Sequence, residues 1–315
     1  QEVKVVIYNA DKTVASTHDM TFDSASGSWS YAGAADLKGS YYRYQMSVYH
    51  PLTAKMESYE VTDPYSLSLS MNSEYSQIVD LNDADLKPEG WDTLEAPHAQ
   101  TTPADIAKTV VYESHVRDLT AFDTEVPAAE RGKYVALTEE NSLAVKHLKD
   151  LSKAGVTHLQ ILPAFDIATI NEDPAKVANL DDKFSKLCEV NEAVKNSDKF
   201  KANCTGDSTV AEVMATLDKD GEDRQELNRM VADTDSFNWG YDPFHYTVPE
   251  GSYATNAEGK QRIVEFRKMV KAVKEDIGMN LVMDVVYNHT NEAGVSSKSV
   301  LDKVVPWYYQ RLDET

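Results

Sequence analysis

The chain of 315 residues is acidic: 31 Lys and Arg stand against 52 Asp and Glu, which gives a formal net charge of −21 at pH 7. Such a charge repels phosphate backbones and anionic membranes, so we expect no nucleic-acid partner. No apolar run approaches the ~18 residues of a membrane span, and the length together with a hydrophobic fraction of 42% predicts a globular chain of two domains.

Residues 1–95 are predicted to form a β-rich domain. Residues 3–8 and 29–31 are short predicted strands, and residues 41–49 alternate in a segment that aromatic side chains dominate. Turn residues separate these segments. Short strands with turns between them are typical of an antiparallel β-sandwich, which is the fold that we expect for this part.

A connector at residues 96–108 follows, and its Pro97 and Pro103 argue against regular structure there. The pattern then becomes α/β from residue 109 to residue 315. The first element of this part is a predicted strand at residues 109–115.

Two amphipathic helices are predicted in the α/β part. The first begins at an N-cap, Thr138, and ends at Gly155, after which a strand opens at Val156. Residues 166–255 form a long excursion, and the second helix then ends at Gly278 directly before another strand. The residues with helical spacing are Ala144, His147, Leu148 and Leu151 in the first helix and Ile263, Phe266, Val270, Val273 and Ile277 in the second.

The last predicted strand carries a carboxylate. Residues 281–286 form a nearly continuous apolar run, typical of a parallel strand covered on both faces, with Asp284 in its middle. A buried carboxylate costs several kcal/mol unless it is paired or hydrogen-bonded. Asn288 and His289 follow at the C-terminal end of the strand, where ligands bind in parallel α/β folds. A core strand with one satisfied Asp and a functional strand end are both open interpretations.

Five segments together resemble the starch-debranching branch of the α-amylase superfamily. They are residues 112–119 (YESHVRDL), 155–163 (GVTHLQILP), 237–243 (FNWGYDP), 248–253 (VPEGSY) and 284–290 (DVVYNHT). Residues 188–191 and 306–309 are similar to secreted bacterial pullulanases in particular. The family that the whole chain resembles is therefore type I pullulanase, a glycoside hydrolase.

This resemblance implies that residues 1–95 are a carbohydrate-binding-like β-sandwich, truncated at its start. Residues 109–315 would be the first part of a catalytic (β/α)8 TIM barrel, with about three of its eight strands. The chain has no initiator Met and no signal peptide, so we expect a fragment of a longer gene product. Aromatic rings of the first domain either bind sugars or pack the domain; the rings in question are Trp29, Tyr31 and Tyr49.

The implied activity of the full-length enzyme is retaining hydrolysis of α-1,6 branch linkages in α-glucans such as pullulan, amylopectin and limit dextrins. Retention needs two carboxylates about 5 Å apart. In the family these come from the fourth and fifth barrel strands, which we expect beyond Thr315, so the fragment itself is predicted to be inactive. The alternatives are an isoamylase-type debranching enzyme, a glucan-branching enzyme and a non-catalytic glucan-binding protein.

Two residues are implied to bind substrate. His289 matches the family histidine that hydrogen-bonds the glucose unit at the cleavage point, and Tyr241 matches the tyrosine that stacks on the same ring. The structural alternatives are a core histidine and a tyrosine that packs its own loop. His115 and His245 are expected to have structural roles.

Four further residues are implied to support this site. Asp284 would contribute by hydrogen bonding rather than as the nucleophile, Asp242 would order the loop of the stacking tyrosine, and Trp239 belongs to the same motif. Asn288 matches a position that binds calcium in many α-amylases. Calcium cannot be assigned from this residue alone, and no cofactor is required for the expected hydrolysis.

The two cysteines, Cys188 and Cys204, lie close in sequence in a polar part of the excursion. From the residues alone, they are either two independent thiols or a disulfide. The family resemblance implies export to the extracellular space or cell surface, where a disulfide is stable and adds ~3 kcal/mol. Neither cysteine belongs to a Cys/His pattern typical of a zinc site.

Overall fold

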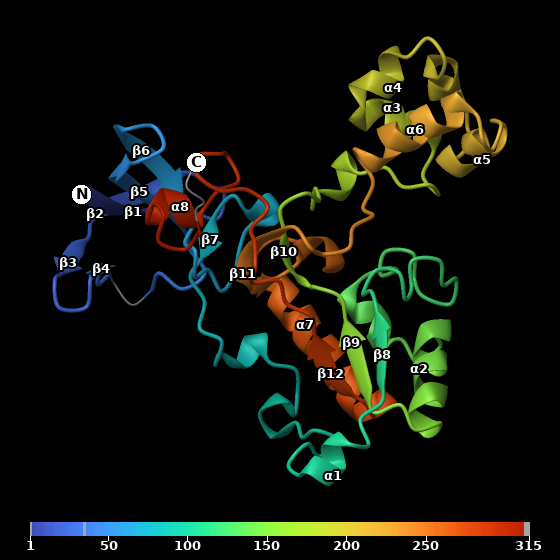
Figure 1. Cartoon of the computed structure of the whole chain (residues 1–315), viewed down its shortest axis with the longest axis horizontal. Helices are drawn as coiled ribbons and strands as arrows, with labels where there is room; N and C mark the ends of the chain where they lie inside the picture. The colour runs from blue at the N-terminus through green and yellow to red at the C-terminus, as the bar shows by residue number, and fades with distance from the viewer. Residues whose placement is uncertain (1, 34–35, 312–315) are drawn as a thin grey trace. The chain divides into compact units, whose positions relative to one another are not determined.

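The computed structural model describes residues 2–33 and 36–311 (Figure 1). Thr315, beyond which the catalytic carboxylates are expected, lies outside the described residues. No helix in these two ranges is long and apolar enough to cross a membrane.

Contacts divide the chain into two compact units. The first consists of Gln1–Ala168 together with Trp239–Thr315, and the second is Thr169–Asn238. The second unit therefore lies inside the excursion predicted at residues 166–255. It is joined to the first unit at both of its ends, so it is an insertion in the sequence of the first.

The N-terminal part of the first unit is an antiparallel sheet in the order β2-β1-β5-β6, with β7 paired to β5. Its strands are β1 (Glu2–Tyr8), β2 (Val14–Asp19), β5 (Tyr41–His50), β6 (Lys55–Val61) and β7 (Ser76–Gln77). Val3 pairs with Met46, and Val5 pairs with Tyr44, so β-branched and aromatic residues meet across the strands. A separate hairpin joins β3 (Thr21–Asp23) to β4 (Ser28–Ser30).

One face of this sheet packs on a distant part of the chain. Val3, Met46 and Val61 are buried in one cluster with Val300. Val300 directly precedes the short helix α8 (Leu301–Val304), which lies beside the sheet (Figure 1). The last described residues of the chain thus help to bury the N-terminal sheet.

The second sheet of the first unit is parallel, in the order β12-β9-β8. Its strands are β8 (Val111–Ser114), β9 (His158–Ile161) and β12 (Asn280–Met283). Helix α2 (Leu143–Lys153) lies between the first two strands in sequence, and α7 (Gln261–Ala272) precedes the third, so strands and helices alternate as expected for an α/β segment. The short helix α1 (Pro103–Ile106) lies within the predicted connector.

Helix α2 begins four residues later than predicted. Its N-cap is Ser142, whose hydroxyl accepts from the Val145 amide, and the Asp123 carboxylate accepts from the Leu143 amide at the same helix end. Thr138 instead ends a 3-10 helix and donates to a carbonyl three residues earlier. The assignment of His147 to the buried face was also wrong, because its side chain is exposed and Val145 is buried in its place.

Strand β12 is shorter than predicted, and Asp284 lies just after it rather than in its middle. The Asp284 amide still donates to the Ile161 carbonyl. The next rung of a parallel ladder would need an amide hydrogen from Pro163, which proline lacks. Helix α7 continues as a π-helical turn, Val273–Ile277, and then ends at Gly278, whose left-handed φ of 82° confirms the predicted stop.

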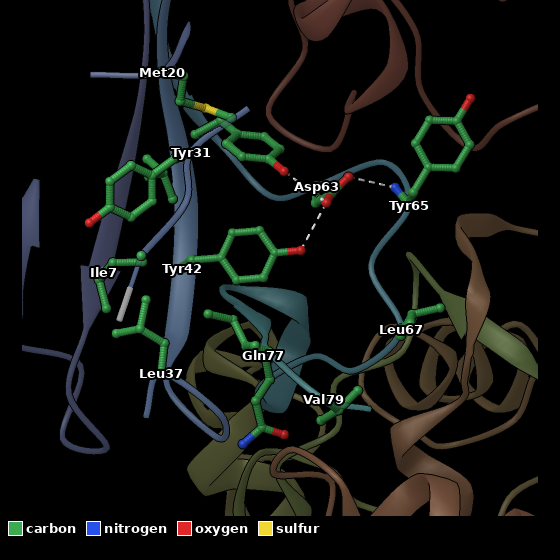
Figure 2. Close-up of a pocket in the computed structure, with 14 residues that line it drawn as sticks. Ile7, Met20, Tyr31, Leu37, Tyr42, Asp63, Tyr65, Leu67, Gln77 and Val79 are labelled. Carbon is green, nitrogen blue, oxygen red and sulfur yellow. Dashed lines mark hydrogen bonds between the residues drawn. The ribbon is translucent and has the colours of Figure 1, made fainter. Parts of the chain in front are cut away.

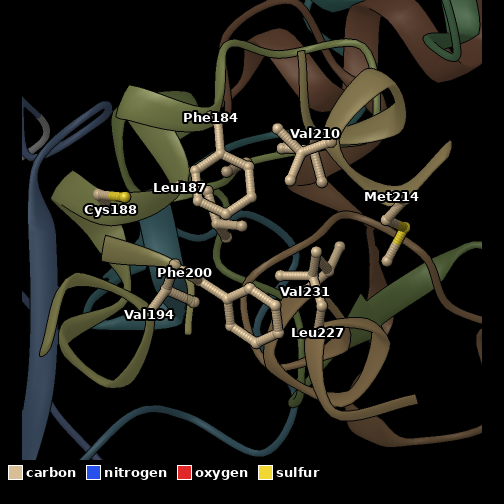
Figure 3. Close-up of a cluster of buried hydrophobic side chains, with 11 residues drawn as sticks. Phe184, Leu187, Cys188, Val194, Phe200, Val210, Met214, Leu227 and Val231 are labelled. Carbon is tan, nitrogen blue, oxygen red and sulfur yellow. The ribbon is translucent and has the colours of Figure 1, made fainter. Parts of the chain in front are cut away.

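The second unit is helical and has a core of its own (Figure 3). Its α-helices are α3 (Phe184–Val190), α4 (Glu192–Asn196), α5 (Val210–Ala215) and α6 (Glu222–Ala232). Phe184, Phe200 and Leu227 are among its buried side chains. Cys188 and Cys204, 16 positions apart in sequence, form a disulfide with their Cα atoms 5.7 Å apart, which ties α3 to a 3-10 helix.

Candidate functional site

The site residues predicted from the sequence lie at the C-terminal ends of β9 and β12. The loop that carries Tyr241 approaches the end of β9 at Gly240, which has a left-handed φ of 80°. A Cβ on Gly240 would lie 2.3 Å from the Pro163 carbonyl oxygen, so only glycine fits this position. Strand β11 (Pro243–Pro249) follows the loop and pairs with β10 (Phe165–Ile167).

Tyr241 and Asp284 form the central contact of the site. The Tyr241 hydroxyl donates to Asp284 Oδ2 over 2.5 Å, although the two residues are 43 positions apart. This hydrogen bond, partial burial and the negative charges of Asp284 and Glu113 raise the pKa of Tyr241 to about 12. The hydroxyl therefore remains protonated at neutral pH and continues to donate, while 37% of the tyrosine side chain stays exposed.

Both ring nitrogens of His289 make hydrogen bonds. Nε2 lies 2.8 Å from the Tyr241 carbonyl oxygen, and Nδ1 lies 3.0 Å from the amide nitrogen of Asn288. A carbonyl only accepts and an amide nitrogen only donates, so the proton resides on Nε2. Both His289 and Asn288 are exposed. The structure thus brings Tyr241, Asp284, Asn288 and His289 into one hydrogen-bonded cluster, with the imidazole N–H directed at the tyrosine backbone.

The two remaining predicted residues flank this cluster. Trp239 is 63% exposed, so its ring is largely available to solvent. Asp242 is half-buried, and its backbone carbonyl accepts from the Ala168 amide over 2.9 Å, which ties the end of the loop to the residue after β10.

Three residues near the site were not predicted from the sequence. Gln160 on β9 donates to the Glu113 carboxylate on β8 over 3.0 Å, and these two residues are direct neighbours in the parallel register. Tyr246 on β11 donates to the His289 carbonyl over 2.8 Å. Gln160 is a polar residue between the apolar Leu159 and Ile161 of β9, which is the signal that could have identified it.

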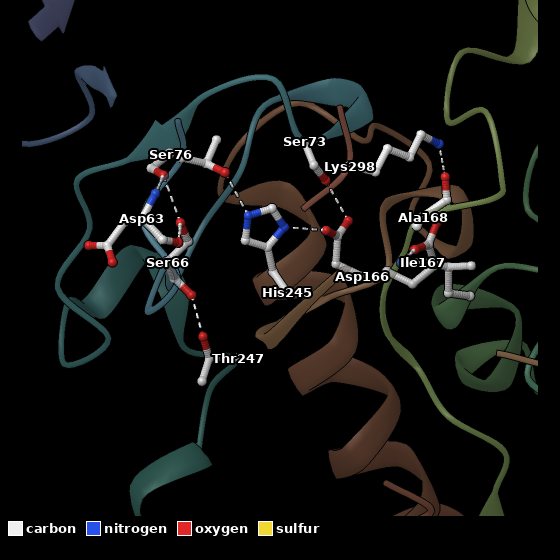
Figure 4. Close-up of polar contacts among 12 residues, drawn as sticks. Asp63, Ser66, Ser73, Ser76, Asp166, Ile167, Ala168, His245, Thr247 and Lys298 are labelled. Carbon is white, nitrogen blue, oxygen red and sulfur yellow. Dashed lines mark hydrogen bonds and ion pairs between the residues drawn. The ribbon is translucent and has the colours of Figure 1, made fainter. Parts of the chain in front are cut away.

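Two further histidines of the α/β part, His115 and His245, are buried in polar networks. His115 Nε2 lies 3.1 Å from the Tyr253 hydroxyl. His245 contacts Asp166 through Nδ1 at 2.6 Å and the Thr62 hydroxyl through Nε2 at 2.8 Å (Figure 4). These contacts join the N-terminal sheet region to β10 and β11.

Asp166 is the charged centre of this second network. Burial opposes its ionisation, but the hydrogen bond from His245, the charge of Arg262 and the hydroxyl of Ser73 prevail and lower its pKa. Ser73 donates over 2.5 Å, and an Arg262 nitrogen lies 3.7 Å away. The carboxylate is therefore ionised and paired inside the first unit.

A cavity of about 370 Å³ lies on the N-terminal sheet (Figure 2). The hydroxyls of Tyr42 and Tyr44 both donate to Asp63 Oδ2, at 2.8 and 3.0 Å, and Tyr31 lines the same cavity. Burial and the Asp63 charge raise the pKa of both donors. Of the other candidate sugar-binding rings, Trp29 is partly buried against the apolar cluster of the sheet and Tyr49 is exposed.

Comparison with known proteins shows which proteins this chain is similar to. Residues 167–237 match the family described as Pullulanase Ins domain. The chain is 62% identical over its whole length to a pullulanase of Klebsiella aerogenes, of which it covers 29%. The chain is similar to pullulanases from end to end. The family resemblance inferred from the sequence motifs is thereby confirmed.

The similarity to pullulanases extends to three-dimensional structure. Crystallised PulA from Klebsiella oxytoca matches 99% of the chain with a TM-score of 0.96 and 61% identity, and the match covers 30% of that protein. A Klebsiella pneumoniae pullulanase complexed with maltotriose matches 99% of the chain with the same TM-score and 62% identity, again over 30% of that protein. The chain thus spans about a third of the length of these solved pullulanases.

Proposed function

We propose that this chain is a segment of an extracellular or cell-surface pullulanase. The full-length enzyme would hydrolyse α-1,6 branch linkages in pullulan, amylopectin and limit dextrins with retention. The observation that carries the proposal is the cluster of Tyr241, Asp284 and His289, in a chain that is 62% identical to a pullulanase. The disulfide of the second unit supports export, because disulfides persist in oxidising compartments.

The parallel sheet is proposed to be the first three strands of a (β/α)8 barrel. In support of this, β8, β9 and β12 lie side by side in the sheet in the order in which they occur along the chain, as consecutive barrel strands do. Val111 and Val282, on the outer two of these strands, are 49% and 38% exposed, so the sheet carries apolar surface that further strands and helices can cover. The antiparallel sheet and the β3-β4 hairpin would form the carbohydrate-binding-like sandwich.

In this proposal the chain binds the sugar next to the scissile bond. The partly exposed ring of Tyr241 offers a face for stacking on a glucose unit. His289 carries its proton on Nε2, and binding requires that this N–H exchange the Tyr241 carbonyl for a sugar hydroxyl. A hydrogen bond that holds the sugar in its reacting orientation accelerates the reaction.

The catalytic carboxylates are proposed to lie outside this chain, beyond Thr315. A retaining glycosidase needs a nucleophile and an acid/base about 5 Å apart. Asp284 accepts the Tyr241 hydroxyl and would therefore fix the orientation of the stacking ring rather than attack the sugar. We assign no cofactor, and we place no calcium at Asn288, whose amide donates to the ring of His289.

Substitution of His289 in the full-length enzyme tests this proposal. His289→Ala removes a donor that orients the sugar for reaction, so kcat on pullulan should fall by about 10²-fold while KM changes less. His147→Ala is the matched control, because it removes an exposed histidine on α2. A kcat for His289→Ala close to that of the control would contradict the assignment of the substrate site.

A further inference from the structure

Strand β11 presents two adjacent side chains to opposite sides. His245 is buried against Asp166 and Thr62. Tyr246, the next residue, is half-buried and reaches the segment after β12 that carries His289. Alternation along a strand explains this division. One side of β11 is therefore anchored in a buried polar network, and the other contacts the candidate site.

The ring of Tyr246 is held from two directions. It meets Phe165 of β10 edge to face with ring centroids 5.7 Å apart, and it meets Tyr287 in a similar arrangement at 5.4 Å. Its hydroxyl donates to the His289 carbonyl over 2.8 Å. Burial, and then the neighbouring Tyr287 hydroxyl, raise the pKa of Tyr246, so the hydroxyl remains a donor across the neutral range.

The segment that receives this hydrogen bond has no regular structure of its own. Residues 284–291 belong to neither a strand nor a helix. Besides Tyr246, β11 holds this segment through the Pro243 carbonyl, which accepts from the Asn291 amide over 3.1 Å. Two hydrogen bonds to one strand thus hold this segment, one at the His289 carbonyl and one two residues later.

We propose that Tyr246 is a positioning residue for His289. Its hydroxyl fixes the backbone of His289, and the backbone position sets where the imidazole N–H meets the sugar. This inference rests on the proposed role of His289 in substrate binding. In this proposal Tyr246 does not contact the substrate. The site then also includes strand β11, where Tyr246 lies between two of the sequence motifs, residues 237–243 and 248–253.

A double-mutant cycle in the full-length enzyme tests this inference. Tyr246→Phe keeps the ring between Phe165 and Tyr287 and removes only the hydroxyl. Loss of one neutral hydrogen bond corresponds to a fall of about 3- to 10-fold in kcat on pullulan, with a smaller change in KM. In the His289→Ala background the same substitution should have no further effect on kcat. Tyr44→Phe, which removes a hydroxyl bonded to Asp63 in the N-terminal sheet, is the control and should leave kcat unchanged.

Two results would overturn the inference. One is an unchanged kcat for Tyr246→Phe, and the other is an equal fall in both backgrounds, which indicates a structural role unrelated to His289. Failure of the proposed function is visible separately, because His289→Ala alone would then retain the kcat of the parent enzyme. Urea unfolding of Tyr246→Phe and Tyr44→Phe, compared with the parent, shows whether both variants fold.

Discussion

At the scale of single residues, the site depends on contacts between side chains and backbone from separate loops. Tyr241 donates to Asp284, and the Tyr241 carbonyl accepts from His289. Gly240 permits this approach because a side chain there would collide with Pro163. The three predicted residues are therefore coupled, and a change in one is expected to displace the others.

Substitutions of Tyr241 should distinguish the contribution of its hydroxyl to kcat/KM from the contribution of its ring. Tyr241→Phe removes the bond to Asp284, which is weakened by solvent because the tyrosine is 37% exposed. We therefore expect kcat/KM on pullulan to fall by about 3- to 10-fold. Tyr241→Ala also removes a stacking face worth about 1–3 kcal/mol and should cost a further tenfold or more. Equal values of kcat/KM for the two variants would show that the ring does not contact substrate.

Candidate site residues could be named from the sequence, whereas their hydrogen bonds could not be predicted from it. Tyr241 and His289 were predicted from motifs that they share with a known family. The partners of Gln160 and Tyr246 depend on strand register and on long-range contacts, which no local pattern encodes. The proton position on His289 likewise follows only from its two neighbours in space.

At the scale of elements, the spacing of apolar residues predicted the helices better than it predicted their ends. The stop of the second helix at Gly278 was predictable because a left-handed residue is a local requirement. The start of α2 was not, since the choice of Ser142 over Thr138 depends on Asp123, which lies 19 residues before Ser142 in sequence. Strand β12 ends early because Pro163, two residues after the end of β9, lacks the amide hydrogen for the next rung.

The pair of Asp166 and His245 between β10 and β11 should make stability depend on pH. The folded pKa of Asp166 is lowered, so its ionised form stabilises the fold fully above the unfolded pKa of about 3.9. This contribution is lost as the pH falls through the lower folded value. Asp166→Asn should therefore be destabilised by about 3–5 kcal/mol at pH 6, because it leaves buried partners unpaired.

Urea unfolding of the chain between pH 6 and about pH 3 measures this effect. The difference in unfolding free energy between the parent and Asp166→Asn should shrink as the pH falls. Asp19→Asn is the control, since Asp19 is 85% exposed in a surface pair with Lys4 and should matter little at any pH. A difference that is constant across this range would show that Asp166 does not titrate as described.

At the scale of the whole molecule, the chain combines two compact units of different structure. The first contains the N-terminal sheet, the parallel sheet and the candidate site, and the second is a helical insertion with its own core and disulfide. The sequence indicated the excursion as a break in strand–helix alternation. It did not indicate that residues 169–238 form a compact unit, because the short helices there have weak periodicity and gain stability from packing on one another.

The central claim is that this chain carries sugar-binding residues of a pullulanase while the catalytic carboxylates lie outside it. The most direct test measures reducing ends released from pullulan by the purified 315-residue chain and, in parallel, by the full-length enzyme. We predict release by the full-length enzyme and none by the chain above a heat-treated control. Release of reducing ends by the chain alone would contradict the claim and would require a catalytic carboxylate pair within these 315 residues.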